Sequence, residues 1–357
     1  VISEYSVRNK FDENIPVYSV TNEKGFCTGY FSKEVASKDK STYKIVPRGY
    51  FAYNPSRINV GSVDWQKYED RVIVSPLYVV FGVSDRLDRQ YLLHYLKSDM
   101  MLSFIKEYAT GSVRDNLKLA DLGKFPINLR PVEEQRQIAA TLDKIDELIA
   151  KRRQQLDKLD ELVKSRFIEM FGDPVENPHG FRKVALSELA EIKIGPFGSL
   201  LHKEDYIEGG HPLLNPSHIV DGKVVPDRKL TISDKKYDEL KAYHLHIGDV
   251  VMGRRGEMGR CAVVPSEGFL CGTGSLLIRT KGEVTADYIQ KIISFPSFRK
   301  TIEDMAVGQT MPNLNVPIVS KFQIIKPPIE VQKNYYKFVA QTDKSKLAIQ
   351  KSLEKLE

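Results

Sequence analysis

The sequence has no apolar run long enough to cross a membrane. Its longest uninterrupted apolar runs are short pieces such as residues 77–82, whereas a spanning helix needs about 20 apolar residues. It opens without the basic and apolar segments that direct secretion, so we expect no export signal. Three cysteines, Cys27, Cys261 and Cys271, are too few for a disulfide scaffold and favour a reducing compartment. These absences predict a cytoplasmic protein.

Sequence motifs of common enzyme classes are also missing. No phosphate-binding G-x-x-x-x-G-K-[ST] loop occurs, and the spaced glycines of residues 253–259 lie between expected strands instead of opening the helix that a dinucleotide site needs. Residues 54–57, Asn-Pro-Ser-Arg, begin like the base-holding loop of amino-methyltransferases but lack its second proline and its aromatic ring. Four residues are of the types that bind zinc, but their spacing matches no known pattern of paired zinc ligands: His244, His246, Cys261 and Cys271. We predict no metal site and no catalytic residue, and only a triad assembled across the fold stays open.

The composition is that of a globular protein with substantial cores. Hydrophobic residues make up 41% of the chain and charged residues 28%. At roughly 150 residues per domain, the 357 residues predict two domains and a connector. Lys+Arg 53 against Asp+Glu 47 gives a net charge of +6, which is compatible with a polyanionic partner but does not require one.

An internal repeat organises the chain. Residues 91–160 align without a gap on residues 288–357, a shift of 197, and 16 of the 70 pairs are identical, where ordinary residue usage gives roughly 4 by chance. The identical pairs include Asn116/Asn313, Leu117/Leu314, Pro131/Pro328 and Gln135/Gln332. The shift is too long for a solenoid, so we expect a duplicated unit, a globular domain followed by a helix.

The helix of the first copy is the clearest element. Pro131 is expected to end a strand over residues 125–129, and about 40 residues then pass without Gly or Pro until residues 172–174, Gly-Asp-Pro. Apolar residues recur at spacings of three and four, which indicates a narrow coiled-coil seam. Nine acidic and eight basic residues flank this seam between residues 132 and 171. Such a mixed surface does not favour phosphate, so the helix is predicted to bind protein.

The helix of the second copy, from residue 329 onward, repeats the seam. Thr342 and Lys346 interrupt it where the first helix has Ile145 and Ile149. Because each helix alone exposes its seam, we expect an intramolecular antiparallel pair. The second helix ends 11 residues before the counterpart of residue 171, so we expect it to be clipped or shorter. The residues expected at this interface are Leu142, Ile145, Ile149, Leu156, Leu159, Val163, Val339, Ile349 and Leu353.

The globular part of the second copy is predicted to be α+β. Strand-like residues 183–186 precede a short helix from Ser187, and a hairpin-rich stretch covers residues 245–279. A further helix is expected from Thr285 to about Met305.

In the first copy, residues 15–20 match the neighbourhood of residues 211–215. The opening strand and helix that residues 184–190 supply in the second copy therefore have no counterpart, and we expect the N-terminus to be incomplete.

Residues suited to nucleic-acid recognition gather in loops. Residues 47–59 mix cations, aromatic rings and amides, residues 253–260 contain three arginines, and the paired segments 111–116 and 308–313 place polar side chains after a glycine. Arginine binds guanine and asparagine or glutamine binds adenine in the major groove. The alternative for each residue is a solvated loop or a turn, and for the two glycines a helix C-cap. The candidate DNA-contacting residues are Arg48, Tyr53, Asn54, Arg57, Asn59, Arg114, Asn116, Arg254, Arg255, Arg260, Gln309 and Asn313.

Two stretches together carry a family resemblance. Residues 128–138, Asn-Leu-Arg-Pro-Val-Glu-Glu-Gln-Arg-Gln-Ile, lead into the long helix that runs to residue 174, and residues 326–332, Lys-Pro-Pro-Ile-Glu-Val-Gln, are a weaker echo. With this duplicated pattern, nearly the whole chain resembles the specificity subunit of type I restriction–modification enzymes. Residues 248–259 also look like a recurrent hairpin of that family, from which the first copy departs with Arg-Gly-Tyr at residues 48–50.

The resemblance implies an α+β fold with a pseudo-twofold internal repeat, in which two α/β target-recognition domains are separated by two long antiparallel coiled-coil helices. The implied domains are a first recognition domain (1–130), a central helix (131–173), a second recognition domain (174–327) and a C-terminal helix (328–357).

The resemblance further implies a non-catalytic, sequence-specific DNA-binding subunit of the bacterial or archaeal cytoplasm. Each recognition domain would read one half of a bipartite double-stranded DNA target, while the helices would fix the spacer and dock two methyltransferase subunits. AdoMet, ATP and Mg²⁺ would bind to those and to the endonuclease subunits, and this chain would hold no cofactor. The alternatives are a methyltransferase or nuclease in its own right, and a coiled-coil scaffold without DNA sequence preference.

Overall fold

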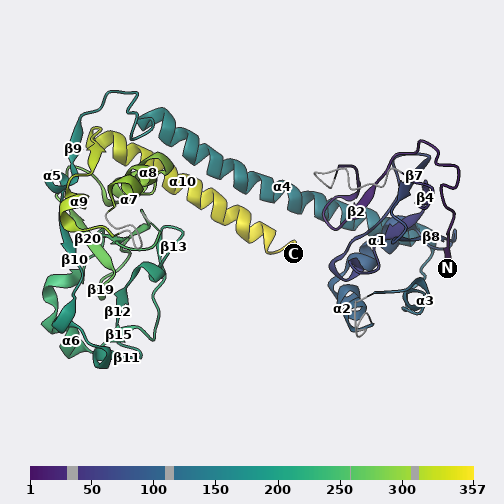
Figure 1. Ribbon diagram of the computed structural model, residues 1–357, viewed down its shortest axis with the longest axis horizontal. Coiled ribbons are helices and arrows are strands. Elements are labelled where there is room, and N and C mark those ends of the chain that lie inside the picture. The colour runs from purple at the N-terminus through teal and green to yellow at the C-terminus, as the bar shows by residue number, and fades with distance from the viewer. Residues whose placement is uncertain (30–38, 109–115, 258, 307–312) are drawn as a thin grey trace. The chain divides into compact units, whose positions relative to one another are not determined.

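The computed structural model describes residues 1–29, 39–108, 116–257, 259–306 and 313–357 (Figure 1). The chain divides into two compact units, the first containing residues 1–151 with Leu356 and the second containing residues 152–355 with Glu357. Every helix within the described ranges is too short or too polar to cross a membrane.

The first unit is built on a four-stranded antiparallel sheet in the order β1-β8-β5-β6. Two smaller antiparallel ladders, β2 with β3 and β4 with β7, share an apolar core with it. The strands are β1 (Ile2–Glu4), β2 (Ser19–Thr21), β3 (Gly25–Cys27), β4 (Lys44–Pro47), β5 (Phe51–Tyr53), β6 (Val63–Trp65), β7 (Arg71–Val74) and β8 (Val79–Val83). The short helices are α1 (Arg89–Lys97), α2 (Asp99–Tyr108) and α3 (Leu119–Leu122).

The second unit has the same kind of sheet, β10-β20-β17-β18, and a five-stranded sheet, β11-β15-β12-β19-β16. Small ladders join β13 to β14 and β21 to β9. The strands are β9 (Lys183–Ala185), β10 (Ala190–Ile194), β11 (Tyr206–Ile207), β12 (His211–Leu214), β13 (Ile219–Val220), β14 (Lys223–Val224), β15 (Thr231–Ile232), β16 (His244–Leu245), β17 (Val250–Gly253), β18 (Cys261–Val263), β19 (Phe269–Cys271), β20 (Ser275–Thr280) and β21 (Gln323–Ile325). The short helices are α5 (Leu186–Leu189), α6 (Asp234–Glu239), α7 (Ala286–Ile293), α8 (Pro296–Met305) and α9 (Val316–Ser320).

The backbone carries the duplication that the sequence predicts. The two four-stranded sheets have the same order when β1, β8, β5 and β6 are matched with β10, β20, β17 and β18. The parallel bridge from Val17 to Ile73 has its counterpart in the parallel pairing of β12 with β19, which supports the match of residues 15–20 with residues 211–215. Gly49 and Gly248, with φ of 87° and 84°, turn the chain into β5 and β17, a conformation that glycine adopts without a steric penalty. Gly49 therefore takes the place of Gly248 in the first copy.

Two expected elements differ from the structure. Residues 125–129 form no strand. At the equivalent place in the second unit, β21 pairs with β9, and the described part of the first unit contains no counterpart of β9 for residues 125–129 to pair with. The helix expected from Thr285 to Met305 is divided into α7 and α8. Pro296 takes the first position of α8, where its missing N–H breaks no hydrogen bond. The first unit divides in the same way between α1 and α2 with Asp99 at the matching position, so the proline suits the break and does not alone cause it.

The two long helices are α4 (Val132–Phe171) and α10 (Ile329–Leu353). In the second unit, α10 lies beside the C-terminal half of α4 and runs in the opposite direction (Figure 1). The expected antiparallel pairing is confirmed there. The contacting pairs, in order along α10 and the residues that follow it, are Tyr335 Oη with Val163 O (3.3 Å), Lys346 Nζ with Asp160 Oδ1 (2.5 Å) and Glu357 Oε1 with Arg153 Nη2 (2.8 Å).

Aromatic side chains anchor the end of α4 in the core of the second unit. Phe167 and Phe171 are fully buried, and the ring centroid of Phe171 lies 5.2 Å from that of Tyr288 and 5.5 Å from that of Tyr335. Gly172, with a φ of 70°, ends the helix directly after this cluster. Because each ring buries about 150–250 Å², the last turn of α4 is an integral part of this core.

The seam residues of the two helices are half-buried, except for Leu142, whose exposed fraction is 37%. Val163 and Val339 pack against the core of the second unit. The two interruptions of the second seam are accommodated, since the Thr342 hydroxyl donates to the Phe338 carbonyl (3.0 Å) within its own helix and Lys346 reaches a carboxylate of α4. That the remaining seam residues form a subunit or helix interface stays a prediction.

Candidate nucleic-acid interface

In the second unit, two arginines and an asparagine meet at the end of β17. The Arg254 N–H donates to the Gly274 carbonyl (3.0 Å), and the Arg254 carbonyl accepts from the Leu314 N–H (2.9 Å). Arg255 and Asn313 form an antiparallel bridge, and Arg254 Nε donates to Asn313 Oδ1 (3.1 Å). Three of the predicted candidates, which come from two separate segments, therefore share one site.

The two arginines of this site differ in exposure. Arg254 is half-buried, and burial together with the nearby charge of Arg255 lowers the pKa of Arg254. It stays protonated at neutral pH, because a guanidinium is effectively always charged in proteins. The Arg255 side chain is exposed, and Gly256, with a φ of 79°, turns the chain directly after it. Arg255 is thus a solvent-facing cation on a backbone that hydrogen bonds hold in place.

Arg260, in the same loop, is engaged by the protein. Its Nε donates to Glu257 Oε2 (3.1 Å) and its Nη1 donates to the Pro216 carbonyl (3.2 Å), while Arg299 of α8 binds Glu257 Oε1 (3.0 Å). The hydrogen bond from Arg260, followed by the charges around it, lowers the pKa of Glu257. These side chains line a hollow of about 390 Å³. Arg299 could not be recognised from the sequence, because a single cation on an amphipathic helix is usually a solvated residue.

In the first unit, three candidates line two neighbouring hollows. Asn54 borders both, a hollow of about 550 Å³ that it shares with Arg57 and one of about 520 Å³ that it shares with Asn116. Arg57 and Asn116 are exposed, and Asn54 is half-buried. Asn54 Oδ1 accepts from the Ser56 N–H (3.1 Å) and the Ser56 hydroxyl (2.9 Å), so it also forms the turn that the alternative interpretation predicts.

The two sites are built in the same way. In the first unit the Leu117 N–H donates to the Pro55 carbonyl (3.2 Å), and in the second the Leu314 N–H donates to the Arg254 carbonyl (2.9 Å). Each contact joins the loop after a central strand, β5 or β17, to the repeated Asn-Leu pair. The sequence showed the repeated pair but not its partner loop, because β5 and β17 are matched by strand pairing and not by identical residues.

The remaining candidates lie elsewhere. Arg48 is exposed and turned to its own loop, where it donates to the carbonyls of Glu69 (3.3 Å) and Tyr68 (3.2 Å) and lies 3.4 Å from Asp70. Asn59 is half-buried in a 3-10 turn. Arg114 and Gln309 lie outside the described residues.

The prediction for Tyr53 is wrong. Its side chain is fully buried, and its hydroxyl donates to the Leu117 carbonyl (3.0 Å). Burial raises the pKa of Tyr53 well above its ordinary value. The Tyr53 hydroxyl holds the Asn-Leu segment in place from within the core, but the side chain is not exposed and cannot contact a nucleic acid.

Tyr53→Phe tests this supporting role. Loss of a buried hydrogen bond is expected to lower the free energy of unfolding of the first unit by about 1 kcal/mol. Trp65, the only tryptophan of the chain, lies in this unit, so urea unfolding followed by its fluorescence measures the effect. The control is Tyr68→Phe, because Tyr68 is exposed. Equal stabilities of the two variants would contradict the role of the Tyr53 hydroxyl.

Within the ranges that the structure describes, no group of three or more His, Cys, Asp or Glu side chains is arranged to hold a metal ion. Cys261 and Cys271 are buried, and burial raises the pKa of each to about 12. His244 and His246 instead contact the Tyr237 carbonyl (2.7 Å) and Glu267 (2.9 Å), respectively. Side chains considered for zinc in the sequence therefore serve the core and the surface of the second unit.

Comparison with protein families gives a match over most of the chain. The type I restriction modification DNA specificity domain matches twice, over residues 3–161 and residues 178–357. Two curated specificity subunits from Methanocaldococcus jannaschii are similar. That of the type I restriction enzyme MjaVIII is 23% identical over 266 residues, which cover 69% of this chain and 61% of the relative. That of MjaIX is 22% identical over 278 residues, with 71% and 62% covered. The chain thus spans about three fifths of the length of these relatives.

Solved structures share the fold. A chain from a study of complex assembly and conformational transition in a type I R-M system has a TM-score of 0.61 at 18% identity, with 100% of this chain and 94% of that chain covered. The type I restriction-modification S subunit from M. genitalium has a TM-score of 0.55 at 15% identity, with 100% and 90% covered. The HsdS subunit from Thermoanaerobacter tengcongensis has a TM-score of 0.52 at 16% identity, with 99% and 90% covered.

Proposed function

Because the chain belongs to the family of type I restriction modification DNA specificity domains, we propose that it is the subunit that reads double-stranded DNA in a restriction–modification complex. Each of its two recognition domains, within residues 1–130 and 174–327, reads one half of a bipartite target. The chain recognises DNA and leaves the chemistry to its partners.

The observation that carries this proposal is the repeated construction of the two candidate sites. In both units the same backbone hydrogen bond brings the Asn-Leu pair to the loop after a central strand. The exposed side chains there, Arg57 and Asn116 in one unit and Arg255 in the other, are of the types that read base edges in the major groove. Two similar sites with different side chains suit a target whose halves differ in sequence.

We assign the long helices a spacing and docking role. The C-terminal half of α4 is held in the second unit by its aromatic end and by α10, and its N-terminal half belongs to the first unit. The helix is thus a continuous connection between two domains that contact DNA, and its length fixes the unread spacer. Two methyltransferase subunits bind to the seam and to the mixed charged residues that flank it.

The cofactors of the complex would bind to the partner subunits that carry out the chemistry. AdoMet would bind to the methyltransferase subunits, and ATP and Mg²⁺ to endonuclease subunits that complete the complex. This chain itself would bind none of them. The complex would act in the cytoplasm of a bacterium or archaeon.

Salt-dependent DNA binding tests the proposal. We expect the purified chain to prefer its own bipartite duplex over a duplex with scrambled half-sites. Because cations displace counterions from phosphates, the logarithm of the binding constant should fall with the logarithm of the salt concentration by about 0.9 per phosphate contacted. Fluorescence anisotropy at several salt concentrations measures both properties. Equal binding to the two duplexes would instead favour the scaffold without sequence preference.

A further inference from the structure

A buried glutamine lies in the first turn of each long helix. Gln135 and Gln332, called the root glutamines below, are fully buried and lie at equivalent places of the repeat, each four residues after a proline. Glutamine is mostly an exposed residue, and on a helix that is otherwise charged it normally faces solvent. Two buried copies at equivalent positions call for a physical reason.

Gln135 joins α4 to the start of α1. Its Oε1 accepts from the N–H of Asp88 (2.8 Å), the N-cap residue of α1, and its Nε2 donates to the carbonyls of Arg86 (2.9 Å) and Arg130 (2.7 Å). The acceptor and both donors of the amide are therefore used. A carboxylate of the same shape supplies no donors, so the contact specifies an amide.

Gln332 repeats the arrangement in the second unit. Its Oε1 accepts from the N–H of Thr285 (3.0 Å), the N-cap residue of α7, and its Nε2 donates to the carbonyl of Pro327 (3.0 Å). In both units the amide thus bridges the N-cap of the first helix after the sheet and the carbonyl five residues before itself. Because a buried amide is stable only when its partners are correctly placed, each root glutamine fixes the direction of its long helix within its unit.

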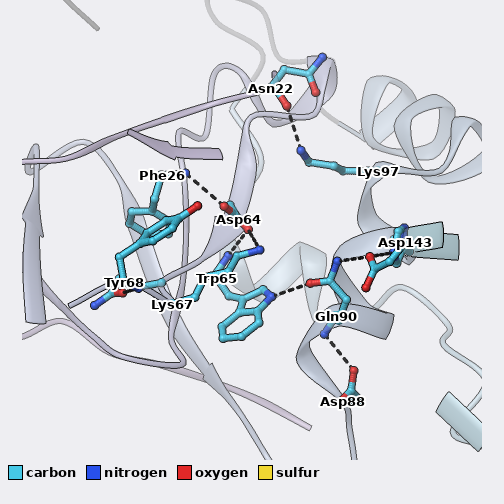
Figure 2. A network of polar contacts seen from close by, with 12 residues as sticks. Asn22, Phe26, Asp64, Trp65, Lys67, Tyr68, Asp88, Gln90, Lys97 and Asp143 are labelled. Atoms are coloured by element: carbon cyan, nitrogen blue, oxygen red, sulfur yellow. Dashed lines mark hydrogen bonds and ion pairs between the residues drawn. The ribbon is translucent and has the colours of Figure 1, made fainter. Parts of the chain in front are cut away.

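The first unit adds a second attachment two turns along α4 (Figure 2). Trp65 Nε1 of β6 donates to Gln90 Oε1 of α1 (3.1 Å), and Gln90 Nε2 donates to Asp143 Oδ1 of α4 (2.6 Å). His94 Nε2 also lies 2.8 Å from Asp143 Oδ1. The equivalent position in α10 is Ala340, so this attachment belongs to the first unit alone.

We infer that Gln135 and Gln332, with Asp143 as a second support in the first unit, are positioning residues that set the spacing of the two DNA half-sites. This inference rests on the proposed function. The root glutamines are fully buried, so their side chains cannot reach a base. They act by holding each long helix at one angle to its recognition domain, and a change in that angle alters which spacer fits both domains.

Methylation maps of cells that carry this gene with its neighbouring genes test the inference. The variant Gln135→Glu keeps the shape and the acceptor but places an oxygen against two carbonyls. Its control is Gln137→Glu, the same change at an exposed position of the same helix turn. We expect the Gln135→Glu complex to keep both half-site sequences, to lose methylation at the original spacer about tenfold, as for a buried hydrogen bond left unmade, and to gain sites with an altered spacer. Gln332→Glu should act in the same way.

A purely structural role predicts another pattern. It lowers stability and weakens methylation at an unchanged spacer, and that result would overturn the inference. Trp65 fluorescence shows whether Gln135→Glu is folded. If it is not, Asp143→Ala carries the test, because this side chain is half exposed and its loss should relax the spacer preference without unfolding the unit. A wild-type complex without any bipartite motif would contradict the proposed function itself, which separates the two failures.

Discussion

Replacing Arg255 with alanine should relax the reading of one half-site and leave the other intact. Arg255 is exposed, and its neighbour Arg254 is fixed by Asn313 and by two backbone hydrogen bonds. An arginine that binds a base edge at two points is worth about 1–3 kcal/mol of discrimination. At the position that Arg255 reads, the loss of affinity caused by a wrong base should therefore be about 5- to 150-fold smaller in the variant. Binding to duplexes that differ singly at each position of the target measures this change.

The reciprocal variant is Arg57→Ala, at the candidate site of the first unit. It should relax the other half-site and leave the half read through Arg255 unchanged. Equal weakening of both halves by either variant would show that the arginine contacts phosphate or supports the fold. A lost phosphate contact would also lower the slope of the logarithm of the binding constant against the logarithm of the salt concentration by about 1. A loss of folding would not, so this slope distinguishes the two causes.

Shortening the central helix by one heptad should change the spacer without altering either half-site. Residues 147–153 are suitable, because their removal brings Leu156 into the seam position of Ile149 and preserves the pattern. Seven helical residues span about 10 Å, which corresponds to about three base pairs along a duplex. We therefore expect a methylated spacer shorter by up to about three base pairs.

The matched control replaces the same seven residues with alanine and keeps the length of the helix. It should retain the original spacer, because alanine is the best helix former. An unchanged spacer after the deletion, or a changed one after the alanine replacement, would refute the role of helix length. Methylation maps of both strains provide the comparison.

The sequence predicted the architecture well because the repeat and the helices leave strong patterns. A uniform run of about 40 residues without Gly or Pro has few alternatives to α4. It predicted Tyr53 poorly for a physical reason. β5 lies between β8 and β6 and is covered on both faces, so that Phe51 and Tyr53 enter one core and Ala52 enters another. A fully buried strand shows no alternation, and its tyrosine resembled an exposed ring beside polar residues.

The roles of the root glutamines were equally hidden, although their identity in the repeat was visible. Each accepts a hydrogen bond from a residue 47 positions earlier, and nothing in the local sequence indicates that contact. Charged side chains posed a similar problem, because an arginine engaged by a carboxylate, such as Arg260, and a free one, such as Arg255, look alike in sequence. Tertiary contacts distinguish them.

The most direct test of the account is a methylation map of cells that carry this gene together with its neighbours. We expect one asymmetric motif, made of two short specified segments separated by a fixed number of unspecified bases. A contiguous motif, or methylation that ignores sequence, would contradict the claim that two similar domains on one helical connection read DNA in two parts.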